Sequence, residues 1–270
     1  MSTLPLVFSV TSGKGGVGKT NVAVNLACTL AAAGKRVLLM DGDLGLASVD
    51  VLLGMTPERN IFHLFFDGVT MRDILYDTPY GFKILPASSG VSEMLSLDTG
   101  QKLDLLEAMD VLENDLDYLI VDTGAGINDS VLYFNLAVQE RLVVLTPEPT
   151  ALTDAYALIK VMQMKHEVGR FRVLVNLADD ERAAKDVFTR LYMACDHFLT
   201  GIVLDFAGFV PKDICVRKGV SRQVPFSVAE PQCPASLALR KLAENVQSWE
   251  PAESLDGNIK FFWKKLLFRS

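Results

Sequence analysis

The sequence lacks several features that would assign it to a class at once. It has no apolar run near the roughly 20 residues that a membrane span needs, and no charged, apolar signal segment at its start. It also lacks an excess of basic residues, because its formal net charge is -7. This acidic balance argues against nucleic acid as a partner held by bulk charge. We therefore expect a cytoplasmic protein.

Cysteine is scarce and widely spaced. The four cysteines, Cys28, Cys195, Cys215 and Cys233, form no CxxC pair. This spacing indicates neither a zinc site nor a disulfide framework, so reduced thiols are predicted. Reduced thiols are also what a cytoplasmic protein normally carries.

The chain does have a regular alternation of apolar runs and helix-length segments. Its 270 residues, half of them hydrophobic, are enough to bury one large core. Strands are predicted at residues 6–11, 36–40, 83–86, 118–121, 142–146, 172–175 and 202–204, and helices at 20–33, 101–116, 129–138, 153–166, 181–195 and 234–249. The pattern predicts an α/β fold, a doubly wound, mostly parallel sheet with helices on both faces. Ligands of such sheets bind at the carboxyl ends of the strands.

A glycine-rich segment follows the first predicted strand and opens the first helix. It reads Gly13, Lys14, Gly15, Gly16, Val17, Gly18, Lys19 and Thr20, which matches GxxxxGK[ST]. The glycines allow backbone N–H groups to face phosphate oxygens, and the helix adds its positive end. We expect Lys19 to reach the β- and γ-phosphates of ATP, Thr20 to ligate Mg²⁺, and Asn21 to complete the nucleotide-binding segment.

With Lys14, the segment becomes KGGVGKT, which resembles the deviant Walker A motif of the MinD/ParA ATPases, P-loop NTPases of the SIMIBI class. The resemblance extends over most of the chain. In that family the early lysine reaches the phosphates of a partner subunit, so the resemblance implies a slow, partner-regulated ATPase that forms a homodimer when ATP binds. A solvated loop lysine is the alternative.

Carboxylates end two of the predicted strands. Asp41 and Asp43 follow the second strand, and Asp122 follows the fourth. Such residues can hold the shell of Mg²⁺ or orient an attacking water. By resemblance, Asp43 positions or activates that water, Asp41 supports the metal shell, and Asp122 is the Walker B aspartate. An aspartate after a strand is otherwise often a helix N-cap.

Four further residues are assigned to the nucleotide site by resemblance. Asn176 is expected against adenine, and Pro211 and Asp213 belong to a segment that would close over the base. An ordinary turn before a helix is the alternative for that segment. Glu148 lies in a segment that lines the dimer face of relatives, from which it could reach the nucleotide of the partner.

Residues 43–54 and 122–126 are similar to the flagellar-number regulators of the MinD branch, the FlhG/FleN type. The resemblance implies control of the placement or number of flagella, with a flagellar GTPase, a transcription regulator or a division inhibitor as partner. Two alternatives stay open: a septum-site MinD role, and a ParA-like partition protein with a basic patch at Arg217, Lys218 and Arg222. An iron–sulfur carrier would need paired cysteines that the spacing does not supply.

The sequence divides into three parts: an ATPase domain at residues 1–249, a polar linker at 250–257 and an amphipathic tail helix at 258–270. The tail places apolar side chains on one face and basic ones largely opposite; the apolar set is Ile259, Phe262, Trp263, Leu266 and Leu267, and the basic set is Lys260, Lys264, Lys265 and Arg269. This pattern predicts reversible binding to an anionic membrane at its inner face. The alternative is that the tail packs on its own domain. Both could hold, with the tail docked on the domain without ATP and released in the ATP-bound dimer.

Overall fold

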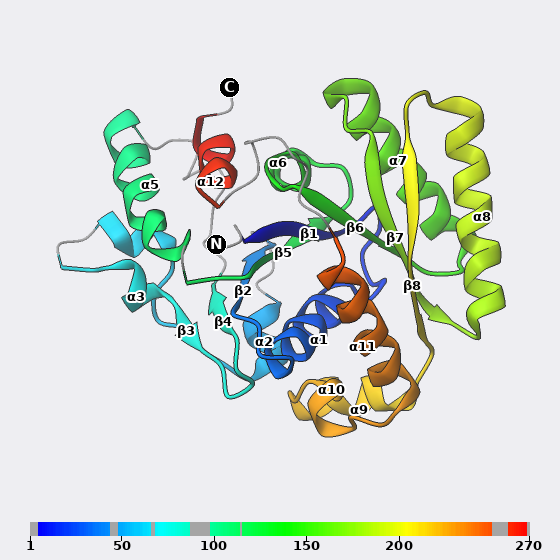
Figure 1. Cartoon of the computed structure of the whole chain (residues 1–270), viewed down its shortest axis with the longest axis horizontal. Helices are drawn as coiled ribbons and strands as arrows, with labels where there is room; N and C mark the ends of the chain where they lie inside the picture. Colours follow the sequence, from blue (N-terminus) through cyan, green and yellow to red (C-terminus); the bar gives the residue numbers. More distant parts are fainter. Residues whose placement is uncertain are drawn as a thin grey trace.

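The computed structural model describes residues 5–43, 48–65, 68–86, 98–113, 115–249 and 259–268. These residues form an eight-stranded sheet in the order β3-β4-β2-β5-β1-β6-β7-β8 (Figure 1). All neighbouring strands are parallel except β3 and β4, which are antiparallel. The predicted doubly wound, mostly parallel sheet is therefore confirmed.

The strands agree with the sequence prediction at all seven predicted positions. They are β1 Leu6–Ser12, β2 Val37–Gly42, β3 Tyr76–Asp77, β4 Lys83–Leu85, β5 Tyr118–Ala125, β6 Glu140–Leu145, β7 Arg170–Ala178 and β8 Val203–Pro211. The sequence missed β3, which is only two residues long. It also ended β8 too early, because the strand continues past a register irregularity that includes Gly208.

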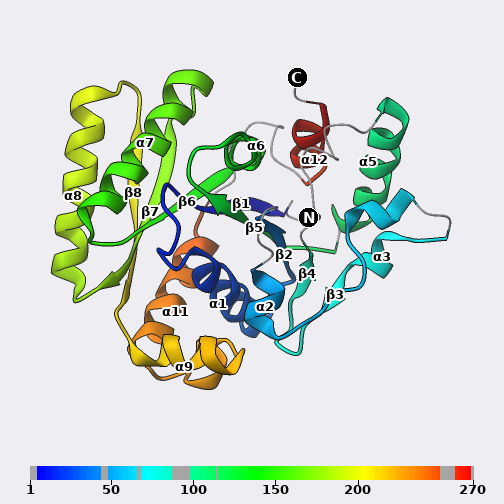
Figure 2. The same ribbon diagram turned by 180° about the vertical axis from the view of Figure 1, so that it is seen from behind.

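Helices cover both faces of the sheet (Figures 1 and 2). One face carries α1 Lys19–Ala32, α2 Val49–Leu53, α9 Ile214–Arg222, α10 Phe226–Ala229 and α11 Pro234–Gln247. The other carries α5 Thr99–Glu113, α6 Asp129–Ala137, α7 Pro149–His166, α8 Glu181–Phe198 and α12 Ile259–Phe268. The short η1 Ile61–Phe65 and α3 Met71–Ile74 lie at the β3 end of the sheet.

The central strand β1 shows how the sequence divides the core in two. All seven of its residues are buried, as expected for a strand covered on both faces. Phe8 and Val10 join the buried cluster beneath α1 and α11, whereas Val7 joins the cluster beneath α5, α6 and α12. This alternation follows from the two-residue period of a strand.

The tail helix α12 is docked on the domain. The five side chains of its predicted apolar face are no more than 1% exposed and join the second cluster; they are Ile259, Phe262, Trp263, Leu266 and Leu267. Helices α5 and α6 are its main neighbours. The predicted amphipathic helix thus exists, and its apolar face is covered by protein, which is the alternative that the sequence left open. The linker 250–257 and Arg269 lie outside the described residues.

The cysteine prediction was wrong for one pair. Cys215 and Cys233 are joined by a disulfide, although their positions in the sequence differ by 18. The fold brings them together because α9, α10 and α11 follow one another on the same face. Cys28 and Cys195 are free and buried, as expected.

Among the described residues, no helix combines the length and the apolar character needed to cross a bilayer.

Candidate functional site

The glycine-rich segment connects the end of β1 to the start of α1 at the middle of the sheet (Figure 2). Gly16 and Gly18 have φ values of 81° and 86°, which L-residues with side chains rarely adopt. At Gly13, a Cβ atom would lie 2.1 Å from the carbonyl oxygen of Asp154 in α7. Gly16 and Gly18 are therefore required by backbone shape, and Gly13 by its close approach to α7.

Lys19 and Asp122 form a buried ion pair at the centre of the site. The Lys19 Nζ lies 2.8 Å from Oδ1 of Asp122, and the two side chains are 8% and 0% exposed. Oδ2 of Asp122 has no hydrogen-bond partner among the described residues. Burial raises the pKa of Asp122, and the Lys19 ammonium opposes this shift.

An unpartnered buried carboxylate oxygen is costly, so Oδ2 of Asp122 is suited to a ligand that offers it a partner. The hydroxyl of Thr20 belongs to the same site and lies 3.1 Å from the Ser48 hydroxyl. Carboxylate, hydroxyl and water oxygens are the ligands that Mg²⁺ prefers. Asp122 and Thr20 therefore fit a magnesium ion, either directly or through bound water.

Asp41 has a more structural environment than the sequence suggested. Its Oδ1 accepts a hydrogen bond from the N–H of Asp43, and its Oδ2 accepts from the N–H groups of Ser48 and Val49. Burial and the nearby charge of Asp122 raise the pKa of Asp41 to about 6. The residue organises the start of α2 beside the site, and a role in the metal shell stays a prediction.

Asp43 lies at the edge of the site. Its carboxylate lies beside Gly124. A Cβ atom built on Gly124 would be 3.6 Å from Oδ1 of Asp43, which is an ordinary van der Waals distance. Its charge also acts on Asp122, where it raises the pKa. Asp43 is thus near the predicted metal and γ-phosphate position, and its action on water stays a prediction.

A buried polar network beneath the glycine-rich segment was missed by the sequence analysis. The Ser9 hydroxyl donates to Asn135 Oδ1 at 2.7 Å, and the Asn135 amide donates to the Thr11 hydroxyl at 3.0 Å. Thr123 then donates to the same Thr11 oxygen at 3.0 Å. The network ties β1 to β5 and α6 directly below the site. Hydroxyls within the apolar run 6–11 were the available signal, but their partners are more than 100 residues away.

Lys14 points toward the start of α7. Its Nζ lies 2.8 Å from Oε2 of Glu148 and 2.9 Å from the Thr150 hydroxyl. The two charged side chains are 36% and 63% exposed, so the ion pair is accessible to solvent. The structure thus brings together the two residues that the sequence assigned to the dimer face.

Asn176 contacts the glycine-rich segment directly. Its amide donates to the carbonyl of Val17 at 2.7 Å, and a Cβ on Gly18 would lie 2.4 Å from its nitrogen. Pro211 ends β8 and pairs with Ala178 of β7, two residues beyond Asn176. The structure therefore groups Asn176 and the 211–213 segment near the P-loop, although adenine contacts stay predicted.

Asp213 is occupied as a helix cap. Its carboxylate accepts hydrogen bonds from the N–H of Cys215 at 3.0 Å and from the N–H of Ala235 at 3.2 Å. These bonds stabilise the N-termini of α9 and α11, which corresponds to the ordinary-turn alternative. Asn21 lies within α1, where its carbonyl accepts from the Asn25 amide.

Comparison with known proteins identifies the family of this chain. Residues 6–173 match a family model described as an AAA domain. The antiactivator FleN of Pseudomonas aeruginosa is 45% identical over 261 residues, which is 97% of this chain and 93% of FleN. This chain belongs to the MinD/ParA family of ATPases, in its FlhG/FleN branch. The flagellum site-determining protein YlxH of Helicobacter pylori is 29% identical over 263 residues, or 96% of this chain and 89% of YlxH.

Solved MinD structures share the fold of this MinD/ParA ATPase. The MinC:MinD complex of Aquifex aeolicus gives a TM-score of 0.70 at 24% identity and covers 92% of this chain and 98% of that one. MinD of Pyrococcus horikoshii, solved with Mg-ADP, gives 0.69 at 24% identity and covers 90% and 96%. Membership of the family confirms the predicted ATPase activity.

Proposed function

We propose that the chain is an ATP-dependent, dimerising switch that cycles between cytosol and membrane to control the placement or number of flagella. Its similarity to FleN, an antiactivator, and to YlxH, a flagellum site-determining protein, supports the flagellar role. The partner would be a flagellar GTPase or a transcription regulator. A septum-site role is the alternative that MinD relatives suggest.

The nucleotide part of the proposal rests on the P-loop and its carboxylates. Binding of Mg-ATP would exchange the Lys19–Asp122 ion pair for contacts from Lys19 to phosphate and from Asp122 to the metal shell. Magnesium supplies neutralisation of phosphate charge when bound. Thr20 would then ligate the metal, and Asp43 would orient the attacking water from the side of Gly124.

The dimer part rests on Lys14. In this conformation its ammonium is held within its own chain by Glu148. A solvent-exposed ion pair contributes only about 0–1 kcal/mol, so it is readily exchanged. Phosphates carry more charge than one carboxylate and lie in a closing interface with little water, where attraction is stronger. ATP bound to a second copy would therefore draw Lys14 across the dimer face and release Glu148.

The proposed cycling between domain and membrane rests on one observation: α12 is docked on the domain through a wholly buried apolar face. Burial of such a side chain contributes about 1.5–3 kcal/mol, so five contribute on the order of 7–15 kcal/mol. Release into water would lose this energy, whereas transfer into a bilayer would recover most of it. The tail would therefore leave the domain only where lipid accepts it.

The docked tail also contains a built-in weakness. The indole N–H of Trp263 is buried and has no hydrogen-bond partner among the described residues, which costs about 1–3 kcal/mol. At a membrane interface an indole N–H finds polar partners. Lys264 is exposed on the opposite face, where each lysine adds about 1 kcal/mol of attraction to anionic lipid. The balance between domain and membrane is therefore narrow enough for ATP to control.

Sedimentation with liposomes of anionic lipid tests the proposal. The full chain should bind most strongly with Mg-ATP and weakly with ADP or without nucleotide, and removal of residues 259–270 should abolish binding. Lys14→Ala should remove both the ATP dependence and the ATP-induced dimer seen by size-exclusion chromatography. Equal binding in all nucleotide states, or binding that survives the truncation, would refute the switch. An ATP-dependent gel shift with nonspecific DNA would support the partition role instead.

A further inference from the structure

The disulfide lies at the junction of two helix N-termini. Cys215 is in the first turn of α9, Cys233 is the N-cap residue of α11, and their Cα atoms are 6.8 Å apart. These helices have nine and 14 residues, so each has a developed positive end. A helix N-terminus stabilises a thiolate, which is the reactive form of cysteine. Both sulfurs are therefore placed where thiol–disulfide exchange is favoured.

Asp213 completes the junction. Its carboxylate accepts from the N–H of Cys215 in α9 and from the N–H of Ala235 in α11, and one carboxylate oxygen and both sulfurs lie within 4.8 Å of one another. In the reduced protein, a thiolate would face this carboxylate and repel it. Formation of the disulfide removes that charge, so the carboxylate can bridge the two helices.

A metal ion is the other ligand that two cysteines and an aspartate could take. Two features oppose it here. Both oxygens of Asp213 already accept backbone hydrogen bonds, and the positive ends of α9 and α11 converge on the site. A cation would be repelled by both helix ends, whereas an anionic thiolate is attracted.

We propose that Cys215 and Cys233 are a reversible thiol/disulfide site that couples the redox state of small thiols to nucleotide binding. The coupling rests on the proposed function, because it acts on the 211–213 segment beside the nucleotide site. Pro211 pairs with Ala178 of β7, and the N–H of Lys212 donates to the Ala178 carbonyl at 3.0 Å. Asn176 lies two residues earlier on the same strand and binds the Val17 carbonyl.

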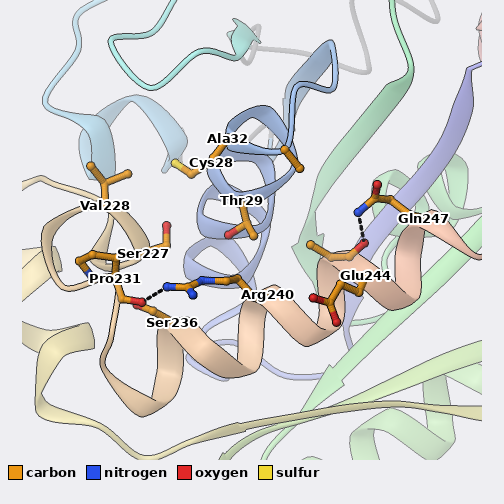
Figure 3. Close-up of a pocket in the computed structure, with 12 residues that line it drawn as sticks. Cys28, Thr29, Ala32, Ser227, Val228, Pro231, Ser236, Arg240, Glu244 and Gln247 are labelled. Carbon is orange, nitrogen blue, oxygen red and sulfur yellow. Dashed lines mark hydrogen bonds between the residues drawn. The ribbon is translucent and has the colours of Figure 1, made fainter.

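The reagent would be a low-molecular-weight disulfide, and Cys233 is the residue it would meet first. Cys233 is half-buried, whereas Cys215 is 4% exposed. The Ser236 hydroxyl lies 3.2 Å from the Cys233 sulfur and donates to the Glu230 carbonyl at 2.8 Å, so it places a polar group beside this sulfur. Ser236 also lines a cavity of about 380 Å³ between α1, α10 and α11 (Figure 3). Arg240 extends along this cavity to the Pro231 carbonyl, so carboxylates of a peptide disulfide would find a cation nearby.

The reaction is an exchange in two steps. The Cys233 thiolate attacks one sulfur of the small disulfide, which forms a mixed disulfide and releases one small thiolate. The Cys215 thiolate then attacks the Cys233 sulfur, forms the protein disulfide and releases the second small thiolate. Two electrons pass from the protein to the reagent, and the two protons lost by the protein thiols end on the released thiols.

The disulfide is linked through the 211–213 segment and β7 to Asn176, which in the conformation described here binds Val17, as Lys19 binds Asp122. Nucleotide binding requires these groups to change partners. Stabilising one state of a two-state equilibrium lowers the affinity for a ligand that prefers the other. We therefore expect the oxidised protein to bind Mg-ATP at least about fivefold more weakly than the reduced protein.

Thiol mapping tests the site itself. The full chain would be equilibrated with reduced and oxidised glutathione in varied ratios, alkylated and analysed by peptide mass spectrometry. A Cys215–Cys233 cross-link that forms and disappears with the ratio is expected, and Cys195→Ser should leave it unchanged. Alkylation of both cysteines at every ratio would overturn the proposal. So would stoichiometric zinc in the reduced protein that is lost in Cys233→Ser.

Calorimetry with Mg-ATP tests the coupling. The affinity for Mg-ATP should be at least about fivefold lower for the oxidised than for the reduced wild-type protein. The Cys215→Ser/Cys233→Ser double variant should bind Mg-ATP with the same affinity in both conditions. Equal affinities of the two wild-type forms would overturn the coupling. Absence of binding by both forms would refute the proposed nucleotide site as well, and the thiol mapping would still report on the disulfide independently.

Discussion

Weakening the groove that holds α12, without altering α12, should increase membrane binding in the absence of ATP. Met109 of α5 is fully buried and belongs to the same cluster as the apolar face of the tail. It lies two turns after Lys102, whose ammonium is 5.8 Å from the ring of Phe268 in α12, so the two residues share the face of α5 that meets the tail. Met109→Ala therefore creates a cavity next to the docked helix.

The magnitude follows from the burial. A buried Met→Ala substitution costs about 2–5 kcal/mol. If about half of a mid-range cost falls on the contact with α12, the docked state loses about 1.8 kcal/mol, which is about twentyfold in the docking equilibrium. Since the tail sequence is unchanged, its affinity for lipid is unchanged as well. Liposome binding without nucleotide should rise by about that factor.

The assay is liposome sedimentation without nucleotide, over a range of lipid concentrations, for the wild type and two variants. Leu103→Ala is the matched control, because Leu103 is on the same helix and is 51% exposed. The control should behave as the wild type. If Met109→Ala lowers the thermal stability of the protein but leaves lipid binding at the wild-type level, docking of the tail does not limit membrane association and the reasoning fails.

Three further predictions concern the site. Gly13→Ala should abolish Mg-ATP binding in calorimetry, because the new Cβ atom would lie 2.1 Å from the carbonyl oxygen of Asp154. Gly15→Ala is the control and should retain binding, because the space around Gly15 is open. Equal affinities of the two variants for Mg-ATP would contradict this account. Asp43→Ala should still form the ATP-dependent dimer but release phosphate at least about tenfold more slowly, and wild-type turnover would exclude Asp43 from the water-orienting role. The pKa of Asp41 is raised from its ordinary value of 3.8 to about 6, so the folded protein holds this proton more tightly than the unfolded chain does. The resulting stabilisation, about 2–3 kcal/mol in the free energy of unfolding, is fully present below pH 3.8 and is lost as the pH rises through 6. Denaturant unfolding at several pH values should show this loss, and Asp41→Asn should flatten it.

The sheet and the phosphate loop could be predicted from local patterns of residues. Short continuous apolar runs such as β1 and β5 are typical of strands buried on both faces, and their alternation with helices leaves little choice of topology. The P-loop is a local feature, because glycines at Gly16 and Gly18 set the backbone shape within a few residues. The grouping of the strand-end aspartates near the phosphate loop could be predicted as well, since parallel strands end at one edge of the sheet.

Which of these residues meet distant partners depends on how the whole chain packs. The ion pair of Lys14 with Glu148 and the network around Asn135 join residues more than 100 positions apart, and no local pattern encodes such pairings. The disulfide between Cys215 and Cys233 depends on how α9 and α11 pack. The fate of the tail was open for the same reason, because an amphipathic face is satisfied equally by lipid and by protein, and the groove that covers it is built by α5 and α6 far away in the chain.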